Sequence, residues 1–388
     1  MKTKDLKIMW SSNSPWGFSG YSNQSRDVLQ RLIKHGIKNI AMSCFYGLEG
    51  GIIDWEGVKC YPKIAQPYGT DALYRHSKDY KADVQFSLQD VWTMDPGMLN
   101  RLSMWVPYVP VDFDPCPKPI IDKLRFANRI ISMSEFGRKA LMDKGFSSYR
   151  IHHGVDTEIF KPMDGMQLRK KYDIPRDIFL FGMVSANKDN PPRKSFQQVI
   201  DAFAEFVKIN PKSGLFFHSI LQQQGGFNIS NYAAYKGLSK HIYHIDPYEV
   251  MFKVDPEGIA QMMNMFDVLL MPSTNEGFGI PAIEAQSCGT PVIINNWTSM
   301  PELITKDTGL LTEVETLRWT NIQSFLAIPS PKSIYEAMKQ LYEEQKGGKL
   351  KKRGENARKW VVENFDHDKI VKERWIPLLQ DIARDVKR

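Results

Sequence analysis

The chain has 388 residues, of which 42% are hydrophobic and 24% are charged. A chain of this length is too long for one ordinary hydrophobic core, so the sequence predicts two domains. The composition is that of a globular protein and not of a disordered or fibrous one. No apolar run is long enough to span a bilayer, and the N-terminus shows no signal-peptide pattern. The four cysteines include no C-x-x-C pair, so we expect no disulfide framework, no zinc site and a cytoplasmic location.

The net charge of +7 is concentrated near the C-terminus, where residues 346–388 hold thirteen Lys or Arg against seven Asp or Glu. The densest cluster covers 346–359. One interpretation is an anionic partner, either DNA or a membrane surface at which the protein is peripheral. The other is an ordinary solvated helix face, and the charge alone does not choose between them.

The N-terminal half is predicted to begin with a strand, a Gly-rich turn and a helix. Leu6–Trp10 has a strand pattern, and apolar residues over 28–33 recur at helical spacing. The turn between them contains Ser19 and Gly20 and is placed to meet a phosphate, as in a Rossmann-like βα unit. Its Gly17-x-x-Gly20 spacing lacks the G-x-G-x-x-G fingerprint, which argues against a nicotinamide dehydrogenase.

Four further strands are predicted in this half: Ile37–Cys44, Ala82–Leu88, Trp105–Val111 and Arg129–Met133. Asp90 follows one of these strands, at the end where open α/β sheets bind ligands. A ligand contact and a capping role are equally compatible with that position. Ser134 is placed to cap the helix after the last of these strands.

The second half repeats this alternation. Turn-forming residues over 153–162 predict a domain boundary, and a strand over 178–186 then leads into a polar loop and a helix. Because strands and helices alternate in both halves, the sequence predicts an α/β protein with two Rossmann-like domains. The last helical region, 369–388, has an apolar face that must pack against another element.

The stretch Phe266–Glu302 predicts a strand, a loop, a short helix and a second strand. Glu276 lies in the loop, and Glu284 is expected in the first turn of the helix that Pro281 begins. Gly277, Phe278 and Gly279 form a turn whose amides can approach an anion or a hydroxyl-rich group beside the helix N-terminus. Alternatively, the glycines only shape the turn and Glu284 only favours the helix dipole.

A cationic loop precedes this stretch in the same half. Lys188, Arg193 and Lys194 follow the strand over 178–186 and precede a helix. Three cations in such a loop can neutralise a diphosphate, and they stabilise the charge that develops when a nucleoside diphosphate leaves. Taken alone, the loop would be interpreted as a solvated charge cluster.

Several motifs together resemble the retaining glycosyltransferases of family 4. The string E-G-F-G-x-P-x-x-E-A begins at Glu276 and is followed by C-G-T-P-V-I and P-E-L-I, as in the donor-sugar site of that family. The Arg193-Lys194 pair and the G-V-D linker that starts at Gly154 stand at matching places. Lys188 and His153 depart from the pattern, because the family usually has Arg and often has Asn there.

The resemblance implies the GT-B fold, two Rossmann-like domains whose active site lies in the cleft between them. It places an acceptor domain at 1–155, a donor domain at 156–368, and a final helix at about 369–388 that packs back on the acceptor domain. It implies a nucleotide-diphosphate sugar as co-substrate, no other cofactor and no metal. The sequence Asp112-Phe113-Asp114 matches a D-x-D metal-binding motif, but it lies in a Pro-rich loop, so we do not interpret it as a metal site.

The resemblance also assigns roles to single residues of the donor half. Glu276 would contact the sugar hydroxyls and Glu284 the ribose hydroxyls, while Arg193 and Lys194 would stabilise the diphosphate. The remaining donor-binding positions implied are Ser19, Gly20, Lys188, Gly277, Phe278, Gly279 and Ile280. Asp90 would face the reacting sugar carbon, near a position where the family usually has His. Donor choice would depend on the loops 222–228 and 253–256.

The function implied is transfer of a sugar to an acceptor hydroxyl with retention of anomeric configuration. The acceptor is open: a glycan, a lipid-linked saccharide, a small molecule or a modified DNA base. Another GT-B enzyme, such as a sugar-nucleotide epimerase or a phosphorylase, is the first alternative. A non-catalytic protein that binds sugar nucleotides is the second.

Overall fold

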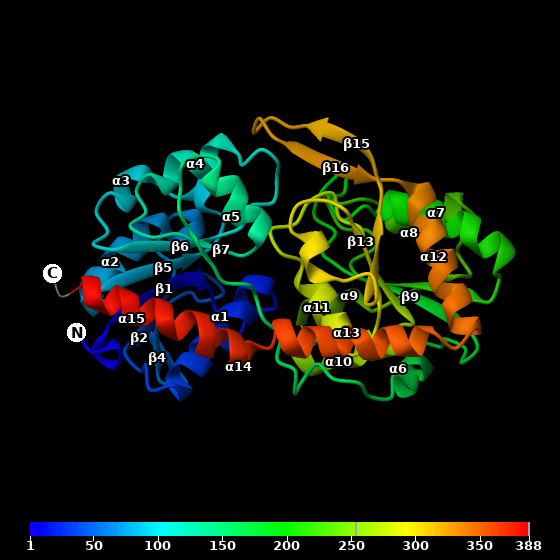
Figure 1. Cartoon of the computed structure of the whole chain (residues 1–388), viewed down its shortest axis with the longest axis horizontal. Helices are drawn as coiled ribbons and strands as arrows, with labels where there is room; N and C mark the ends of the chain where they lie inside the picture. Colours follow the sequence, from blue (N-terminus) through cyan, green and yellow to red (C-terminus); the bar gives the residue numbers. More distant parts are fainter. Residues whose placement is uncertain (253, 387–388) are drawn as a thin grey trace. The chain divides into compact units, whose positions relative to one another are not determined.

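The structure is a computed structural model that describes residues 1–252 and 254–386. The chain divides into two compact units (Figure 1). Unit 1 consists of Met1–Gly154, Asn321–Ser324 and the segment from His367 onward, and unit 2 of Val155–Thr320 and Phe325–Asp366. The chain therefore leaves unit 1 after Gly154, returns to it briefly at Asn321–Ser324 and returns again at His367.

Unit 1 is built on an eight-stranded sheet in the order β3-β4-β2-β1-β5-β6-β7-β8. β3 pairs antiparallel with β4, and the other pairings are parallel. The strands are β1 Ile8–Asn13, β2 Ile40–Tyr46, β3 Ile53–Trp55, β4 Val58–Tyr61, β5 Val84–Leu88, β6 Trp105–Val109, β7 Ile131–Ser132 and β8 Tyr149–Arg150. Its helices are α1 Gly20–Lys34, α2 Thr70–Tyr80, α3 Pro96–Leu99, α4 Lys118–Leu124, α5 Glu135–Met142, α14 His367–Ile370 and α15 Ile376–Asp385.

The C-terminal segment of unit 1 is held by a buried aromatic cluster. Trp375 lies in a π-helical stretch, Val371–Trp375, between α14 and α15. Its ring lies 5.4 Å from Trp10 of β1, 5.8 Å from Phe86 of β5 and 5.5 Å from Tyr108 of β6, measured between centroids. Rings of this size bury large apolar areas. The last helical region therefore contributes to the core of unit 1.

Unit 2 is built on a six-stranded parallel sheet in the order β11-β10-β9-β12-β13-β14 and a separate antiparallel hairpin, β15-β16. The strands are β9 Phe179–Val184, β10 Ser213–His218, β11 Ile242–His244, β12 Val268–Met271, β13 Val292–Asn295, β14 Gly309–Thr312, β15 Val314–Trp319 and β16 Phe325–Pro329. The helices are α6 Met166–Lys171, α7 Phe196–Ile209, α8 Ile229–Tyr235, α9 Pro247–Phe252, α10 Pro256–Met265, α11 Ile280–Ser287, α12 Pro331–Lys346 and α13 Leu350–Asn364.

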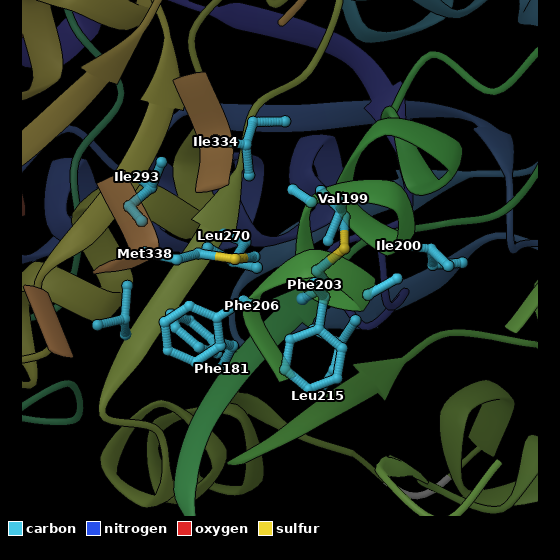
Figure 2. Close-up of a cluster of buried hydrophobic side chains, with 14 of the residues drawn as sticks. Phe181, Val199, Ile200, Phe203, Phe206, Leu215, Leu270, Ile293, Ile334 and Met338 are labelled. Carbon is cyan, nitrogen blue, oxygen red and sulfur yellow. The ribbon is translucent and has the colours of Figure 1, made fainter. Parts of the chain in front are cut away.

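The core of unit 2 follows from the alternation of side chains along its strands. Phe181 of β9 and Leu215 of β10 face α7 and α12, whose buried residues include Phe203 and Met338 (Figure 2). Phe216, one position along β10, instead packs its ring 5.1 Å from Tyr172, which directly follows α6. Because consecutive strand residues point to opposite faces, the continuously apolar strands require helices on both sides. The sheet is therefore covered on both faces.

The predicted α/β class with two Rossmann-like parallel sheets is confirmed. Element bounds differ by a few residues: the first strand covers Ile8–Asn13, and the next covers Ile40–Tyr46. The sequence did not indicate the pairs β3-β4 and β15-β16, because one strand of each pair, β3 and β15, is largely exposed and lacks a buried alternating face. The last helical region is not one uniform helix, since a π-helical stretch interrupts it. Two predicted segments extend beyond the described residues. The predicted loop 253–256 includes Lys253, and the predicted helix 369–388 includes residues 387–388, which all lie outside the described residues.

A search of the described residues finds no helix that is long and apolar enough to cross a bilayer. It also finds no group of three or more His, Cys, Asp or Glu in that part of the chain that could hold a metal ion.

Candidate functional site

The candidate site lies at the carboxyl edge of the unit 2 sheet, where two neighbouring strands end. β9 and β12 are paired in parallel, so their following loops leave the sheet at the same edge. The loop after β9 carries Arg193 and Lys194, and the loop after β12 carries Glu276. Ligands of open α/β sheets bind at this edge.

Glu276 pairs with both cations. Arg193 Nη1 lies 3.0 Å from Glu276 Oε2, and Lys194 Nζ donates to Glu276 Oε1. Arg193 Nη1 also donates to the Asn275 carbonyl oxygen at 2.7 Å. The Glu276 side chain is 10% exposed and that of Arg193 is 37% exposed, so the guanidinium remains accessible from solvent. The result is a triad of one buried carboxylate and two cations from adjacent loops.

The electrostatics of the triad keep Glu276 ionised. Burial alone would raise the pKa of Glu276, but the charges of Arg193 and Lys194 outweigh it and hold that pKa at about 2. Burial lowers the pKa of Lys194, and Glu276 opposes this effect. A buried charge is tolerated where opposite charges and hydrogen bonds compensate for lost water. Glu276 therefore carries its negative charge at neutral pH.

The loop that carries Glu276 is held in place by polar side chains that follow β13. Ser299 Oγ donates to the carbonyl oxygens of Glu276 and Phe278, at 2.8 and 3.0 Å. Thr298 Oγ1 donates to the Glu276 carbonyl oxygen at 3.0 Å. Neither Thr298 nor Ser299 was predicted as a site residue. Their only signal in the sequence is their position beyond the carboxyl end of an apolar strand.

Helix α11 starts directly after the glycine turn. Gly279 is its N-cap at φ +109°, and a Cβ there would lie 2.9 Å from Met271 Cε and 3.0 Å from Leu303 Cδ1. The backbone conformation therefore favours glycine, and the close approach of the Met271 and Leu303 side chains adds to this preference. Glu284 is buried on this helix. It is the fifth residue of α11 and not in the first turn as expected, because the helix already begins at Ile280.

The cationic loop is also constrained. Ser195, which follows Lys194 and is the N-cap of α7, has φ +55° and is fully buried. A non-glycine residue in this left-handed region is strained, and such strain concentrates at functional sites. Asn187 joins this loop to the loop after β10, because its side chain bonds both the amide and the carbonyl of Phe227, at 2.8 and 2.7 Å. Lys188, by contrast, is exposed, and no ion pair links it to Glu276.

The predicted site residues of unit 1 lie at the carboxyl edge of the other sheet. Ser19 caps α1 by accepting from the Ser22 amide at 3.1 Å, and it accepts from Asn13 Nδ2 at 2.7 Å. Gly20 is the first residue of α1. Asp90 follows β5 and precedes the 3₁₀ turn Val91–Thr93, whose amides its side chain does not cap. β1 and β5 are paired, so these residues leave neighbouring strands of one sheet.

The basic segment 346–359 is largely compensated within unit 2. Lys346 pairs with Glu343, Lys352 with Glu355, Arg353 with Glu344 and Lys359 with Glu363. Arg358 donates to backbone carbonyls of Thr157, Phe160 and Ser287. Most of these cations therefore serve the local structure of α12 and α13.

Solved structures with this fold cover almost the whole chain. Sucrose-phosphate synthase from Thermosynechococcus elongatus matches with a TM-score of 0.78 and 17% identity, over 98% of this chain and 100% of that chain. Anabaena Alr3699/HepE, solved in complex with UDP and glucose, matches with a TM-score of 0.72 and 17% identity, over 98% and 99%. The two Rossmann-like units with parallel sheets therefore define a fold of the GT-B class.

Sequence comparisons find curated relatives that match part of this chain. N-acetyl-alpha-D-glucosaminyl L-malate synthase of Bacillus anthracis is 28% identical over 244 residues, 61% of this chain and 54% of the relative. A D-inositol 3-phosphate glycosyltransferase of Thermomonospora curvata is 31% identical over 150 residues, 36% of this chain and 33% of the relative. The chain thus spans between a third and about half of the length of these curated relatives.

The profile of the family Glycosyl transferases group 1 matches residues 167–360, which make up half of the chain. The chain belongs to this family. The resemblance that the motifs of residues 276–303 indicated is thereby confirmed. The match covers both loops of the Glu276 triad as well as α11 with Glu284.

Proposed function

We propose that the protein is a retaining glycosyltransferase that takes a sugar from a nucleotide-diphosphate donor bound by unit 2. The observation that carries this proposal is the convergence of Arg193 and Lys194 on the buried carboxylate of Glu276 at the ends of β9 and β12. Relatives named as glycosyltransferases and a structural neighbour solved with UDP and glucose support it. The four free, buried cysteines fit a reducing, cytoplasmic setting.

The two cations suit a departing diphosphate. Anionic oxygens of a diphosphate offer Arg193 and Lys194 the same kind of partner that Glu276 Oε1 and Oε2 already provide. As the glycosidic bond breaks, the leaving nucleoside diphosphate gains negative charge. Fixed cations therefore stabilise the transition state more than the ground state.

The other residues take positioning roles in this proposal. Glu276 accepts hydrogen bonds from sugar hydroxyls and does not act as a covalent nucleophile, since its carboxylate is engaged by two cations. Glu284 would receive the ribose hydroxyls, and the backbone of 277–280 would meet the sugar and phosphate beside the N-terminus of α11. The acceptor hydroxyl attacks on the leaving-group face, and a diphosphate oxygen takes its proton.

The remaining predicted site residues, Ser19, Gly20 and Asp90, belong to unit 1. Ser19 and Gly20 would close on the diphosphate from the start of α1, and Asp90 would face the reacting sugar carbon from the end of β5. Closure that excludes water would limit hydrolysis of the donor.

A thermal-shift screen of nucleotide sugars tests donor binding. A ligand that binds only the native state raises the melting temperature, so a matching donor should stabilise the wild type and have much less effect on Lys194→Ala. Lys208→Ala is the matched control, because Lys208 is an exposed lysine of the adjacent helix α7 that pairs with Glu205. The proposal fails if no nucleotide sugar or nucleoside diphosphate shifts the wild type, or if both lysine variants respond alike.

Release of the nucleoside diphosphate separates transfer from the alternatives. A transferase releases it in proportion to added acceptor. An epimerase turns over without an acceptor, a phosphorylase requires inorganic phosphate, and a binding protein releases nothing beyond the donor it held. Measuring released nucleotide with and without an acceptor panel therefore tests the reaction class independently of donor binding.

A further inference from the structure

Exposed aromatic side chains gather at the carboxyl edge of the unit 1 sheet. The four rings, between 48% and 67% exposed, are Phe18, Tyr46, Tyr68 and Trp92, which we call the aromatic rim. Each lies at the end of a strand or in the segment that follows it, for β1, β2, β4 and β5 respectively. These strands are consecutive in the sheet order β4-β2-β1-β5 and parallel to one another (Figure 1).

Hydrogen bonds join the segments that carry the rim. Trp16 Nε1, in the segment after β1, donates to the Gly47 carbonyl oxygen after β2 at 3.0 Å. Gln89 Nε2, after β5, donates to the Tyr68 carbonyl oxygen after β4 at 3.3 Å. One hydrogen bond therefore joins the segments that follow β1 and β2, and another joins the segments that follow β5 and β4.

Tyr68 is held in a strained conformation. Its φ is +63°, in the left-handed region that a tyrosine avoids, and Gly69 beside it also has φ +63°. Its ring remains exposed although the ring of Phe45 lies 6.4 Å away. Strain of this kind persists where the surrounding structure imposes it, most often at binding sites. Single exposed apolar residues need no explanation, but here four exposed rings lie at four neighbouring strand ends along one edge of the sheet.

The charges around the rim argue against a polyanionic partner. The segments 14–19, 47–52, 62–69 and 89–95 carry the carboxylates Glu49, Asp90 and Asp95 and one ammonium, Lys63, which is paired with Glu49. Nucleic acids and anionic membranes are bound through an excess of Lys and Arg. Here carboxylates outnumber cations three to one, so the rim suits an uncharged partner.

We propose that the aromatic rim binds the acceptor of the transfer reaction and that this acceptor is a carbohydrate. The faces of sugar rings present C–H groups that pack on the negative faces of aromatic rings, and sugar hydroxyls donate to carboxylates such as Asp90. This inference rests on the proposed function, because it names the acceptor class of the same reaction. It replaces the open choice among glycan, lipid, small molecule and DNA base with one substrate class.

The test uses the full chain, fluorescently labelled, on an array of immobilised glycans in the presence of UDP. Trp92→Ala and Tyr46→Ala should each weaken binding to the retained glycans about 10-fold, because the apolar contact of one ring is lost. Trp319→Ala on the hairpin strand β15 is the matched control, because Trp319 is 54% exposed and Trp92 is 53% exposed. Its binding should equal that of the wild type.

Three outcomes would overturn the inference. Equal glycan binding by Trp92→Ala and Trp319→Ala would show that the rim does not contact the acceptor. Rim-dependent binding to a 20-mer oligonucleotide, or to vesicles of phosphatidylcholine and phosphatidylglycerol, would replace the carbohydrate by that partner. Retention of no glycan by a wild type whose melting temperature still rises with nucleotide sugar would remove this inference and leave the proposed function intact. Loss of that nucleotide-dependent rise would instead count against the proposed function.

Discussion

At the carboxyl edge of the unit 2 sheet, charged side chains form ion pairs with the buried carboxylate of Glu276. At the carboxyl edge of the unit 1 sheet, by contrast, the prominent side chains are exposed aromatic rings. Both edges occupy the position where parallel sheets bind ligands. One edge fixes charge in a low-dielectric setting, and the other presents apolar surface with few charges. Under the proposed function, the two edges would recognise chemically different substrates of one reaction.

Removing one cation of the triad should give the largest effect. Lys194→Ala is expected to lower kcat/KM by about 10²- to 10³-fold, because a preorganised charge aimed at the leaving group is lost. Initial transfer rates at saturating acceptor measure this, with Lys208→Ala as the control. If Lys194→Ala transfers sugar at the wild-type rate, the cations at the unit 2 edge do not stabilise the leaving group, and the proposed difference in role between the two edges is wrong.

The charge of Glu276 should also stabilise unit 2 in a pH-dependent manner. Its pKa is lowered from 4.5 to about 2, so its stabilisation is present above pH 4.5 and is lost as the pH falls toward 2. Compared with Glu276→Gln, the wild type should be more stable at pH 7 by about 3 kcal/mol, and the two should converge near pH 2. Urea unfolding at a series of pH values measures the gap. A gap that is constant with pH would mean that Glu276 contributes through packing and not through its charge.

Relief of backbone strain should have a smaller effect on stability. Each edge has a strained residue with positive φ, Ser195 in unit 2 and Tyr68 in unit 1. Ser195→Gly is expected to raise stability by up to about 1 kcal/mol, because glycine adopts positive φ without the clash of a side chain. Ser195→Ala retains the strain, so its gain should be smaller than that of Ser195→Gly. Calorimetric melting of the three proteins makes the comparison. If Ser195→Gly melts below Ser195→Ala, the methyl group at this position contributes more than the backbone strain costs.

The smallest effect is expected outside both edges, at the basic segment 346–359. Lys349 and Lys351, for which no ion pair is found among the described residues, can be replaced together by alanine. Transfer and donor binding should change less than twofold, since most neighbouring cations already have intramolecular partners. A filter-binding assay with duplex DNA at several salt concentrations is the complementary measurement. Salt-dependent binding that the double substitution abolishes would establish this segment as the anionic-partner surface.

Much of the fold was predictable because its strands are continuously apolar and its turns carry glycine and proline. The strands expected from the sequence at 267–271 and 292–294 match β12 and β13 within one residue at each end, and Ser134 caps α5 as predicted. The predictions were weaker where an element lacks a buried face. The hairpin β15-β16 is mostly exposed on its first strand, so neither strand period nor helix period marks it in the sequence.

The sequence by itself determined the family and the residue types of the donor half, because a glycine turn between two glutamates and an Arg-Lys pair are local patterns. Only the tertiary structure decided that Glu276 pairs with both cations across 82 and 83 positions of chain. Only the tertiary structure placed Phe18, Tyr46, Tyr68 and Trp92 along one edge, since the order of strands in a sheet differs from their order in the chain. Adjacency of this kind arises from strand pairing and burial, which no local pattern encodes.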